Sequence, residues 1–294
     1  FCLLNLQRRG WMVDSPALYE TLATLGRCAD GDIPLAKTSL YLAALAHQGR
    51  GLDPYIHHIA KISGEVGERY QKLIAAGAEE NCETRIAALK HMLCDTYGYD
   101  GDEQTYNDLR NADMIEVIDR RKGLPIALAI LVIDIGRAQG WDVAGVNFPG
   151  HFLVRFDQNG QRVMCDPFHQ FDILQAADLR ALLKRALGDK AELSSGFYRE
   201  ASNRDILLRL QNNIKFRQIE TEHYDDALQT VSVMRLFAPD EYRLLLDDGV
   251  LKARLGRVPE AIQSVRDYLA VVKDPRDKYD AEVLLRTLEG YEGV

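Results

Sequence analysis

The sequence has few cysteines, and none of them sits where a disulfide framework or a structural metal site would need it. The five cysteines are widely spaced and form no CxxC pair. An odd number of dispersed cysteines argues against a disulfide scaffold or a zinc ribbon and favours a reducing compartment. We therefore expect a cytoplasmic protein without a metal or other cofactor.

Long apolar runs and an excess of positive charge are also missing. The longest apolar run, residues 124–135, is interrupted by Asp134 and falls short of the roughly 20 residues that cross a bilayer. The apolar residues 1–6 are followed at once by Gln-Arg-Arg at 7–9, so we expect no signal peptide. The formal net charge is −8, whereas a nucleic-acid-binding surface is normally basic. Membranes and nucleic acids are therefore not the expected partners.

The periodicity of the chain predicts three parts. Residues 1–30 form an N-terminal segment that the pattern does not assign to a domain, although Asp14-Ser15-Pro16 indicates the start of a helix. Residues 31–195 combine helices with one predicted β-hairpin, and residues 196–294 are helical throughout. The pattern predicts helices over 34–47, 53–63, 67–76, 83–96, 114–120 and 125–139 and strands over 152–156 and 161–165. The expected fold class is α+β, mostly helical with a small antiparallel sheet.

The hairpin carries the residues that could do chemistry. Its loop contains Asn159-Gly160, a strong turn signal. Successive strand residues point to opposite faces, so an even-length loop places His151 and Asp166 on one face. A carboxylate that orients an imidazole is the base half of a Cys-His-Asp triad.

The nucleophile of such a triad is missing. In these sites the thiol lies at a helix N-terminus, where the helix dipole stabilises the thiolate. The matching helix start has Pro125, which suits a first helical turn, and no serine or threonine occurs between Tyr106 and Leu193. Cys165 lies in the hairpin, but strand alternation turns it away from His151. We expect Cys165 to be buried and unreactive.

The helical part contains an internal repeat. Tyr224-Asp-Asp-Ala227-Leu lies 34 residues before Val258-Pro-Glu-Ala261-Ile. This period, with a small alanine at the expected helix crossing, resembles the tetratricopeptide repeat. Ala227 and Ala261 are therefore predicted packing positions beneath a surface that binds a protein or peptide.

Three segments together resemble a known family. They are residues 120–131, the string Gly-Val-Asn-Phe-Pro-Gly-His-Phe-Leu-Val-Arg at 145–155, and Asp-Pro-Phe at 166–168. They are similar to the SirB-type branch of the transglutaminase-like superfamily, in which a transglutaminase-like domain precedes tetratricopeptide-like repeats. The resemblance covers about residues 34–290.

The resemblance implies a papain-like α+β fold for the first domain. It aligns the superfamily's catalytic cysteine with Pro125, within one position, its histidine with His151 and its aspartate with Asp166. The branch commonly lacks the cysteine, so the resemblance does not imply acyl transfer. A link to the regulation of bacterial gene expression is attached to the branch's name.

Several functions fit these residues. The first hypothesis is a non-catalytic scaffold or regulatory adaptor that binds a protein partner through its repeats. The second is a hydrolase or acyl-transfer enzyme that uses His151 and Asp166 with an unrecognised nucleophile, such as water or Cys165. The third is a small-molecule or peptide sensor that uses the vestigial cleft. His169 lies three residues after Asp166, with Asp172 nearby, which would allow a metal site, but no third ligand pair has helical or strand spacing, so no metal is predicted.

Overall fold

The computed structural model describes residues 15–292, and the chain divides into two compact units. The first consists chiefly of Ala29–Leu207; the second combines Tyr19–Cys28 with the chain from Leu208 onward. The sequence placed this boundary at residues 195/196, whereas the structure places it inside α8 (Asn203–Glu220).

The first unit is mostly helical. Before the main sheet lie α2 (Leu35–Ala44), α3 (Asp53–Ala75), α4 (Cys82–Lys90), the π-helical turn His91–Thr96, α5 (Met114–Arg120) and α6 (Pro125–Ala138). Two short strands, β1 (Asp100–Gly101) and β2 (Lys122–Gly123), pair in parallel. The main sheet comprises β3 (Asp142–Phe148), β4 (His151–Gln158), β5 (Gln161–Asp166) and β6 (Asp172–Leu174), and α7 (Ala176–Leu187) follows it. Short 3-10 turns cover Asp30–Asp32, Leu109–Asn111, Pro167–His169 and Ser195–Tyr198.

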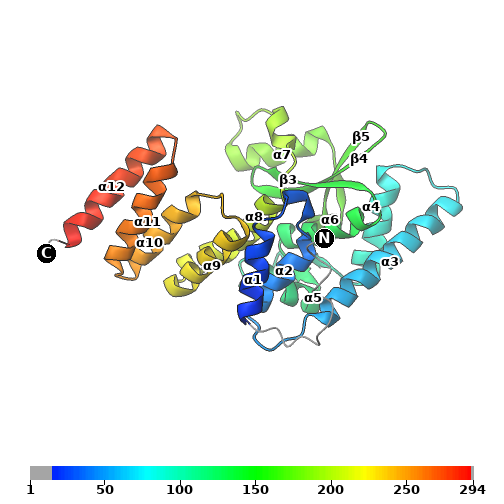
Figure 1. Ribbon diagram of the computed structural model, residues 1–294. Helices are drawn as coiled ribbons and strands as arrows, with labels where there is room; N and C mark the ends of the chain where they lie inside the picture. Colours follow the sequence, from blue (N-terminus) through cyan, green and yellow to red (C-terminus); the bar gives the residue numbers. More distant parts are fainter. Residues whose placement is uncertain (1–14, 293–294) are drawn as a thin grey trace. The chain divides into compact units, whose positions relative to one another are not determined.

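The main sheet is an antiparallel meander in the order β3-β4-β5-β6. Figure 1 shows α6 and α7 on opposite sides of it. On the α7 side, Leu179 and Leu183 pack with Val146, Leu153 and Met164. The chain is therefore α+β with a small antiparallel sheet, as the sequence predicted.

Helix α6 is the buried helix of the first unit. Eleven of its fourteen residues are buried. The helix has apolar side chains on almost all of its sides, and a helix of this kind is buried in a core. At its far end Gly136 lies against β3: a Cβ there would come within 2.8 Å of Val143 Cγ2. Pro125 is its first residue, so the sequence placed the start of this helix correctly.

Helix α3 corrects one prediction. The sequence suggested two helices, 53–63 and 67–76, and glycines occur at 64 and 67, around the expected break. The structure has a single helix, Asp53–Ala75. A Cβ at Gly67 would lie 2.5 Å from Gln139 Oε1, and the Gln139 amide donates a hydrogen bond to the Ser63 carbonyl at 2.9 Å. Gly67 thus leaves room for a neighbouring side chain and does not end the helix.

The second unit consists of helices in the part of the chain that the structure describes. They are α8, α9 (Tyr224–Phe237), α10 (Arg243–Arg254), α11 (Val258–Val271) and α12 (Pro275–Glu292). Most of α1 (Ser15–Leu25) belongs to this unit as well, and Gln229 of α9 donates a hydrogen bond to the Tyr19 hydroxyl at 3.2 Å. Part of the unassigned segment 1–30 is therefore a helix of the second unit; residues 1–14 lie outside the described chain.

The 34-residue repeat recurs in the backbone as well as in the sequence. Helices α9 and α11 each have 14 residues. The turn before each contains a residue with positive φ, Glu222 at 60° and Gly256 at 72°. The residue after each turn has nearly the same φ and ψ, −83° and 66° at His223 and −86° and 60° at Arg257. The paired apolar positions are buried in both copies: Leu210 and Leu244, Val231 and Val265, and Met234 and Tyr268.

This turn gives a direct test of the repeat. Glycine adopts positive φ at little cost, whereas other L-residues lose roughly 1–2 kcal/mol there. We expect Gly256→Ala to lower the free energy of unfolding by about 1 kcal/mol and Glu222→Gly to raise it by a similar or smaller amount. Neither residue is buried, so changes in packing should contribute little to either change in the free energy of unfolding. Urea unfolding would measure both, and changes of the same sign would contradict the shared backbone conformation.

Candidate functional site

His151 is held at the first position of β4 by a two-residue turn. Phe148 pairs with His151 in the β3–β4 register, so only Pro149 and Gly150 connect the strands. Gly150 has a φ of 73°, and a Cβ there would lie 2.8 Å from the Ala186 Cβ. Glycine is therefore required at this turn for conformation and for space.

Asp166 ends β5 and meets His151 on the same face of the sheet. Val154 pairs with Cys165, so Asp166 lies level with Leu153, two residues after His151. His151 Nε2 is 2.6 Å from Asp166 Oδ2, and the two side chains are 13% and 4% exposed. The predicted hydrogen bond between imidazole and carboxylate is present.

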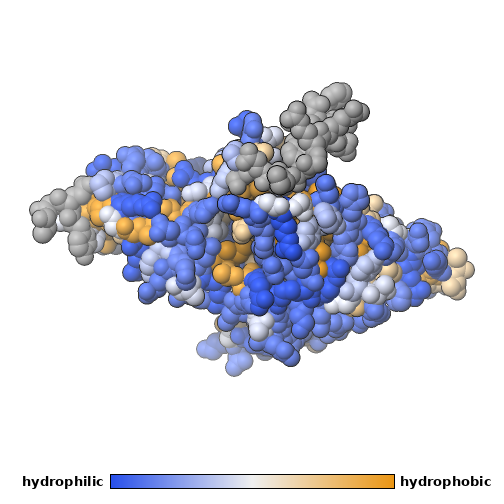
Figure 2. Space-filling view, turned by 90° about the horizontal axis from the view of Figure 1, so that it is seen from below, coloured by the Kyte–Doolittle hydropathy of each residue, from blue (hydrophilic) through white to orange (hydrophobic). Residues whose placement is uncertain are grey.

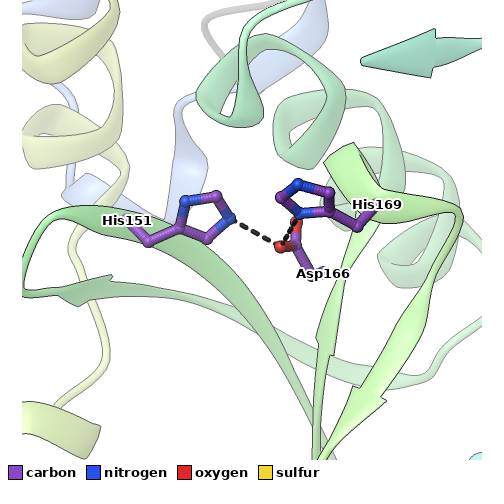
Figure 3. Close-up of side chains that lie close together, drawn as sticks. All are labelled: His151, Asp166 and His169. Carbon is purple, nitrogen blue, oxygen red and sulfur yellow. Dashed lines mark hydrogen bonds and ion pairs between the residues drawn. The ribbon is translucent and has the colours of Figure 1, made fainter. Parts of the chain in front are cut away.

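The structure adds a second histidine that the sequence reasoning did not join to this pair. His169 Nδ1 is 2.7 Å from the same Oδ2 atom of Asp166. The two imidazole rings stack with centroids 5.7 Å apart, and Figure 3 shows both converging on the carboxylate. The signal in the sequence was the spacing Asp166-x-x-His169. The sequence had grouped His169 with Asp166 and Asp172 as a conceivable metal site, but not with His151.

The carboxylate of Asp166 is ionised at neutral pH. Burial acts to raise its pKa, but the hydrogen bonds and charges of His151 and His169 outweigh burial and hold that pKa below its ordinary value. Its other oxygen, Oδ1, accepts the backbone N–H of Phe168 at 3.0 Å. Asp166 therefore orients both imidazoles while the backbone fixes its own position.

Among the described residues, no thiol hydrogen-bonds to the His151 imidazole. Its recorded neighbours are the Asp166 carboxylate and the rings of Phe168 and His169. Cys165 is fully buried, and burial raises the pKa of its thiol well above the ordinary value. The expected burial of Cys165 is confirmed.

The burial of Cys165 predicts slow alkylation. A thiol with a raised pKa has little thiolate at neutral pH, and the thiolate is the reactive form. We expect iodoacetamide to modify Cys165 only after the protein unfolds, which peptide mass spectrometry would show. Modification of Cys165 in the folded protein, at the rate of a free cysteine, would restore it as a possible nucleophile.

A polar cleft of about 500 Å³ adjoins the site. His169 lines it together with Lys122 and the acidic residues Asp100, Glu103 and Asp172. The side of the cleft formed by Asp100 and Glu103 belongs to the segment from Tyr97 to Asn111. Apart from β1 and the 3-10 turn Leu109–Asn111, this segment is a loop.

Buried polar contacts order this loop. Asp102 is 2% exposed, and its carboxylate accepts hydrogen bonds from Arg120 at 2.9 Å and from the Thr105 hydroxyl at 2.6 Å. Arg120 also donates to the Asn111 side chain at 3.0 Å. Burial acts to raise the pKa of Asp102, but hydrogen bonds from Thr105, Arg120 and Asn111 lower it to about 2 from an ordinary value of 3.8.

The lowered pKa of Asp102 predicts a loss of stability in acid. Because the folded pKa lies below the unfolded one, the stability that Asp102 contributes is complete above pH 3.8 and is lost as the pH falls towards about 2. The free energy of unfolding of Asp102→Asn, which cannot ionise, should therefore fall less steeply over this interval. Urea titrations at several pH values would measure the slopes. Asp189→Asn, at an exposed carboxylate, is the control, and equal slopes for wild type and Asp102→Asn would contradict the prediction.

The first unit thus defines a class: an α+β domain with a histidine–aspartate pair at one end of its sheet and a proline at the head of its buried helix. A sequence profile of the transglutaminase-like superfamily matches residues 53–212, which include α3–α7 and the whole site. The chain belongs to the transglutaminase-like superfamily.

Curated relatives extend this similarity. A UPF0162 protein of Xylella fastidiosa is 29% identical over 257 residues, which are 86% of this chain and 88% of the relative. A UPF0162 protein of Pseudomonas aeruginosa is 35% identical over 202 residues, 69% of this chain and 65% of the relative. Human F-box only protein 21 is 24% identical over 223 residues, 71% of this chain but 35% of that longer protein.

Proposed function

We propose that this protein is a non-catalytic member of the SirB-type branch of the transglutaminase-like superfamily, and that it acts as a protein-interaction scaffold or regulatory adaptor. One observation carries the proposal. Pro125 occupies the head of the buried helix, and no thiol among the described residues hydrogen-bonds to His151. A histidine–carboxylate pair without a nucleophile can orient side chains but cannot form an acyl-enzyme.

The helical unit supports the interaction role. Its 34-residue spacing, its matching turns at Glu222 and Gly256, and its buried alanines Ala227 and Ala261 are typical of tetratricopeptide-like repeats. Such repeats stack helix pairs and present an extended surface to a peptide. A protein or peptide partner bound by this unit is therefore proposed.

Exposed apolar side chains on α12 offer a contact for that partner. Tyr279 is 62% exposed and Val283, one helical turn later, is 41% exposed. On the face of the molecule shown in Figure 2, hydrophilic residues predominate and apolar residues form small groups. Aromatic and aliphatic side chains that share one helix face are suitable anchors for a peptide.

A reducing compartment fits the cysteines. The structure describes Cys28, Cys82, Cys94 and Cys165, and no disulfide joins any two of these four residues. No described helix is both long and apolar enough to cross a membrane. We propose a cytoplasmic location, with neither nucleic acid nor membrane as a partner, in keeping with the acidic isoelectric point of about 5.4.

The test compares surface variants of the full chain. Tagged wild type, His151→Ala and the double variant Tyr279→Ser/Val283→Ser would be crosslinked in cells of the source organism, and the captured proteins would be quantified. Leu187→Ser is the matched control, because Leu187 is an apolar residue of α7 that is 59% exposed. We expect one set of partners with wild type, His151→Ala and Leu187→Ser, and its loss with the double variant. If His151→Ala lost these partners and the double variant kept them, the result would count against the scaffold hypothesis.

A second function is favoured by two observations. The His151–Asp166 hydrogen bond is intact at 2.6 Å, and a polar cleft adjoins it. Together these could support a hydrolase or acyl-transfer enzyme in which the His151 imidazole activates water. Under this alternative, His151→Ala abolishes function in cells although the protein stays folded.

A further inference from the structure

We propose that His151, Asp166 and His169 together bind one divalent transition-metal ion, with zinc as the best match. One ligand atom from each of these residues lies within 4.8 Å of the other two, and no other described group of histidine, cysteine and acidic side chains offers three ligand atoms so close together. Two imidazoles and one carboxylate are a ligand set that zinc and related metals use in proteins. This inference goes beyond the scaffold function and does not depend on it.

The two nitrogen–oxygen distances need only a small expansion to admit an ion. Both imidazole nitrogens lie close to Asp166 Oδ2, at 2.6 Å and 2.7 Å. Ligand atoms around a tetrahedral zinc ion are about 3.3 Å apart for bonds of about 2.0–2.1 Å, so each nitrogen–oxygen pair must open by roughly 0.7 Å. The His169 side chain is 46% exposed and can turn to allow this. The metal would then replace the two hydrogen bonds, with each imidazole carrying its proton on the other ring nitrogen.

Neighbouring groups contact two of the three ligand side chains and would orient them towards a bound ion. Glu103 Oε1 lies 3.5 Å from His169 Nε2. Once His169 Nδ1 binds metal, Nε2 would carry the ring proton, and the Glu103 carboxylate can accept a hydrogen bond from that N–H. Such carboxylate–histidine–metal arrangements fix the tautomer of the ligand. On the opposite side, the Phe168 N–H holds Asp166 Oδ1 and leaves Oδ2 to the metal.

The cleft gives the ion a route of entry and an open coordination position. Three carboxylates, Asp100, Glu103 and Asp172, and one cation, Lys122, line it beside His169. This excess of negative charge attracts cations. Three protein ligands with a fourth position open to solvent are the arrangement of catalytic zinc sites, whereas structural sites have four protein ligands.

Isothermal titration calorimetry of the metal-stripped full chain with zinc chloride tests the proposal. We expect one ion per chain with a dissociation constant of about 1 µM or tighter, equivalent to roughly −8 kcal/mol. His169→Ala should weaken binding by about 100-fold or more, and Glu103→Gln by about tenfold. His57→Ala is the matched control, because His57 is an exposed histidine of α3 whose ring hydrogen-bonds to the Asp53 carbonyl of the same helix; the zinc affinity of this variant should equal that of wild type.

Cobalt provides a readout of the ligands themselves. Substitution with Co²⁺ should give visible absorption bands of a four-coordinate site in wild type, Glu103→Gln and His57→Ala, and weaker, shifted bands in His169→Ala. Far-ultraviolet circular dichroism would confirm that each variant is folded. Absence of micromolar binding by wild type, or zinc binding that His169→Ala leaves unchanged, would overturn the proposal. The scaffold proposal would survive either result, because it is judged by partner capture.

Discussion

Ala261→Leu should lower the free energy of unfolding of the helical unit by about 1–3 kcal/mol, because it overpacks a helix crossing. Ala261 is completely buried. Helix α10 approaches α11 at this level through Gly249, where an added Cβ would come within 3.3 Å of the Ala261 carbonyl oxygen and 2.8 Å of Val265 Cγ2. The larger leucine can be accommodated only if the helices move apart. Urea unfolding followed by circular dichroism would measure the change.

Two further alanine-to-leucine variants in the helical unit test whether the position in the repeat causes the loss of stability. Ala227 stands 34 residues earlier in α9 and is also completely buried, so Ala227→Leu should cost a similar amount. Ala270 is an exposed residue of α11, and Ala270→Leu should change stability by less than about 0.5 kcal/mol. If Ala270→Leu lowered the free energy of unfolding as much as Ala261→Leu, overpacking at the helix crossing would not be the cause of the loss.

The same variants separate the two functions. A scaffold depends on the shape of its helical unit, so Ala227→Leu and Ala261→Leu should weaken partner binding. His151→Ala should leave binding nearly unchanged, since His169 still hydrogen-bonds to Asp166 and holds that carboxylate in place. If His151→Ala abolished function in a folded protein and the alanine-to-leucine changes did not, the catalytic alternative would replace the scaffold.

Local chemistry explains which elements the sequence predicted well. Helix α5 begins after Asp113, whose side chain accepts hydrogen bonds from the first-turn N–H groups, and the Asn159-Gly160 turn sets the hairpin register. Once that register is fixed, the shared face of His151 and Asp166 follows from alternation alone. These features depend on residues that are neighbours in the sequence.

Features that depend on distant residues were missed. Strand β3 was not predicted, because its pairing with β4 and its packing against α6 come from elsewhere in the chain. Helix α1 joins the second unit through a contact with Gln229, 210 residues away. His169 reaches Asp166 through a 3-10 turn followed by two residues with positive φ, Gln170 and Phe171. No hydrophobic periodicity indicates such a turn, so the meeting of His169 with the His151–Asp166 pair became visible only in three dimensions.

Pro125→Cys should create a thiol with a pKa below about 7.5, because thiols at helix N-termini near a histidine lie well below the ordinary value of about 8.5. The helix head is already formed: Leu124 precedes it in an extended conformation, and Pro125 occupies its first turn. If the superfamily's cysteine has been lost from this position, His151 should lie within reach of the new thiol. Removing the imidazole should then raise the thiol pKa by about one unit or more, since a charged histidine stabilises the thiolate.

The decisive comparison is between Pro125→Cys and Pro125→Cys/His151→Ala. Thiolate absorbance in the ultraviolet, followed against pH, reports the pKa without requiring a reagent to enter the buried helix head. Leu124→Cys serves as the matched variant, because the superfamily position aligns with Pro125 only to within one residue. Titrations of Pro125→Cys and of Leu124→Cys that were each unchanged by His151→Ala would mean that neither position faces the imidazole. The histidine–aspartate pair would then be a structural or metal-binding feature, with no lost nucleophile beside it.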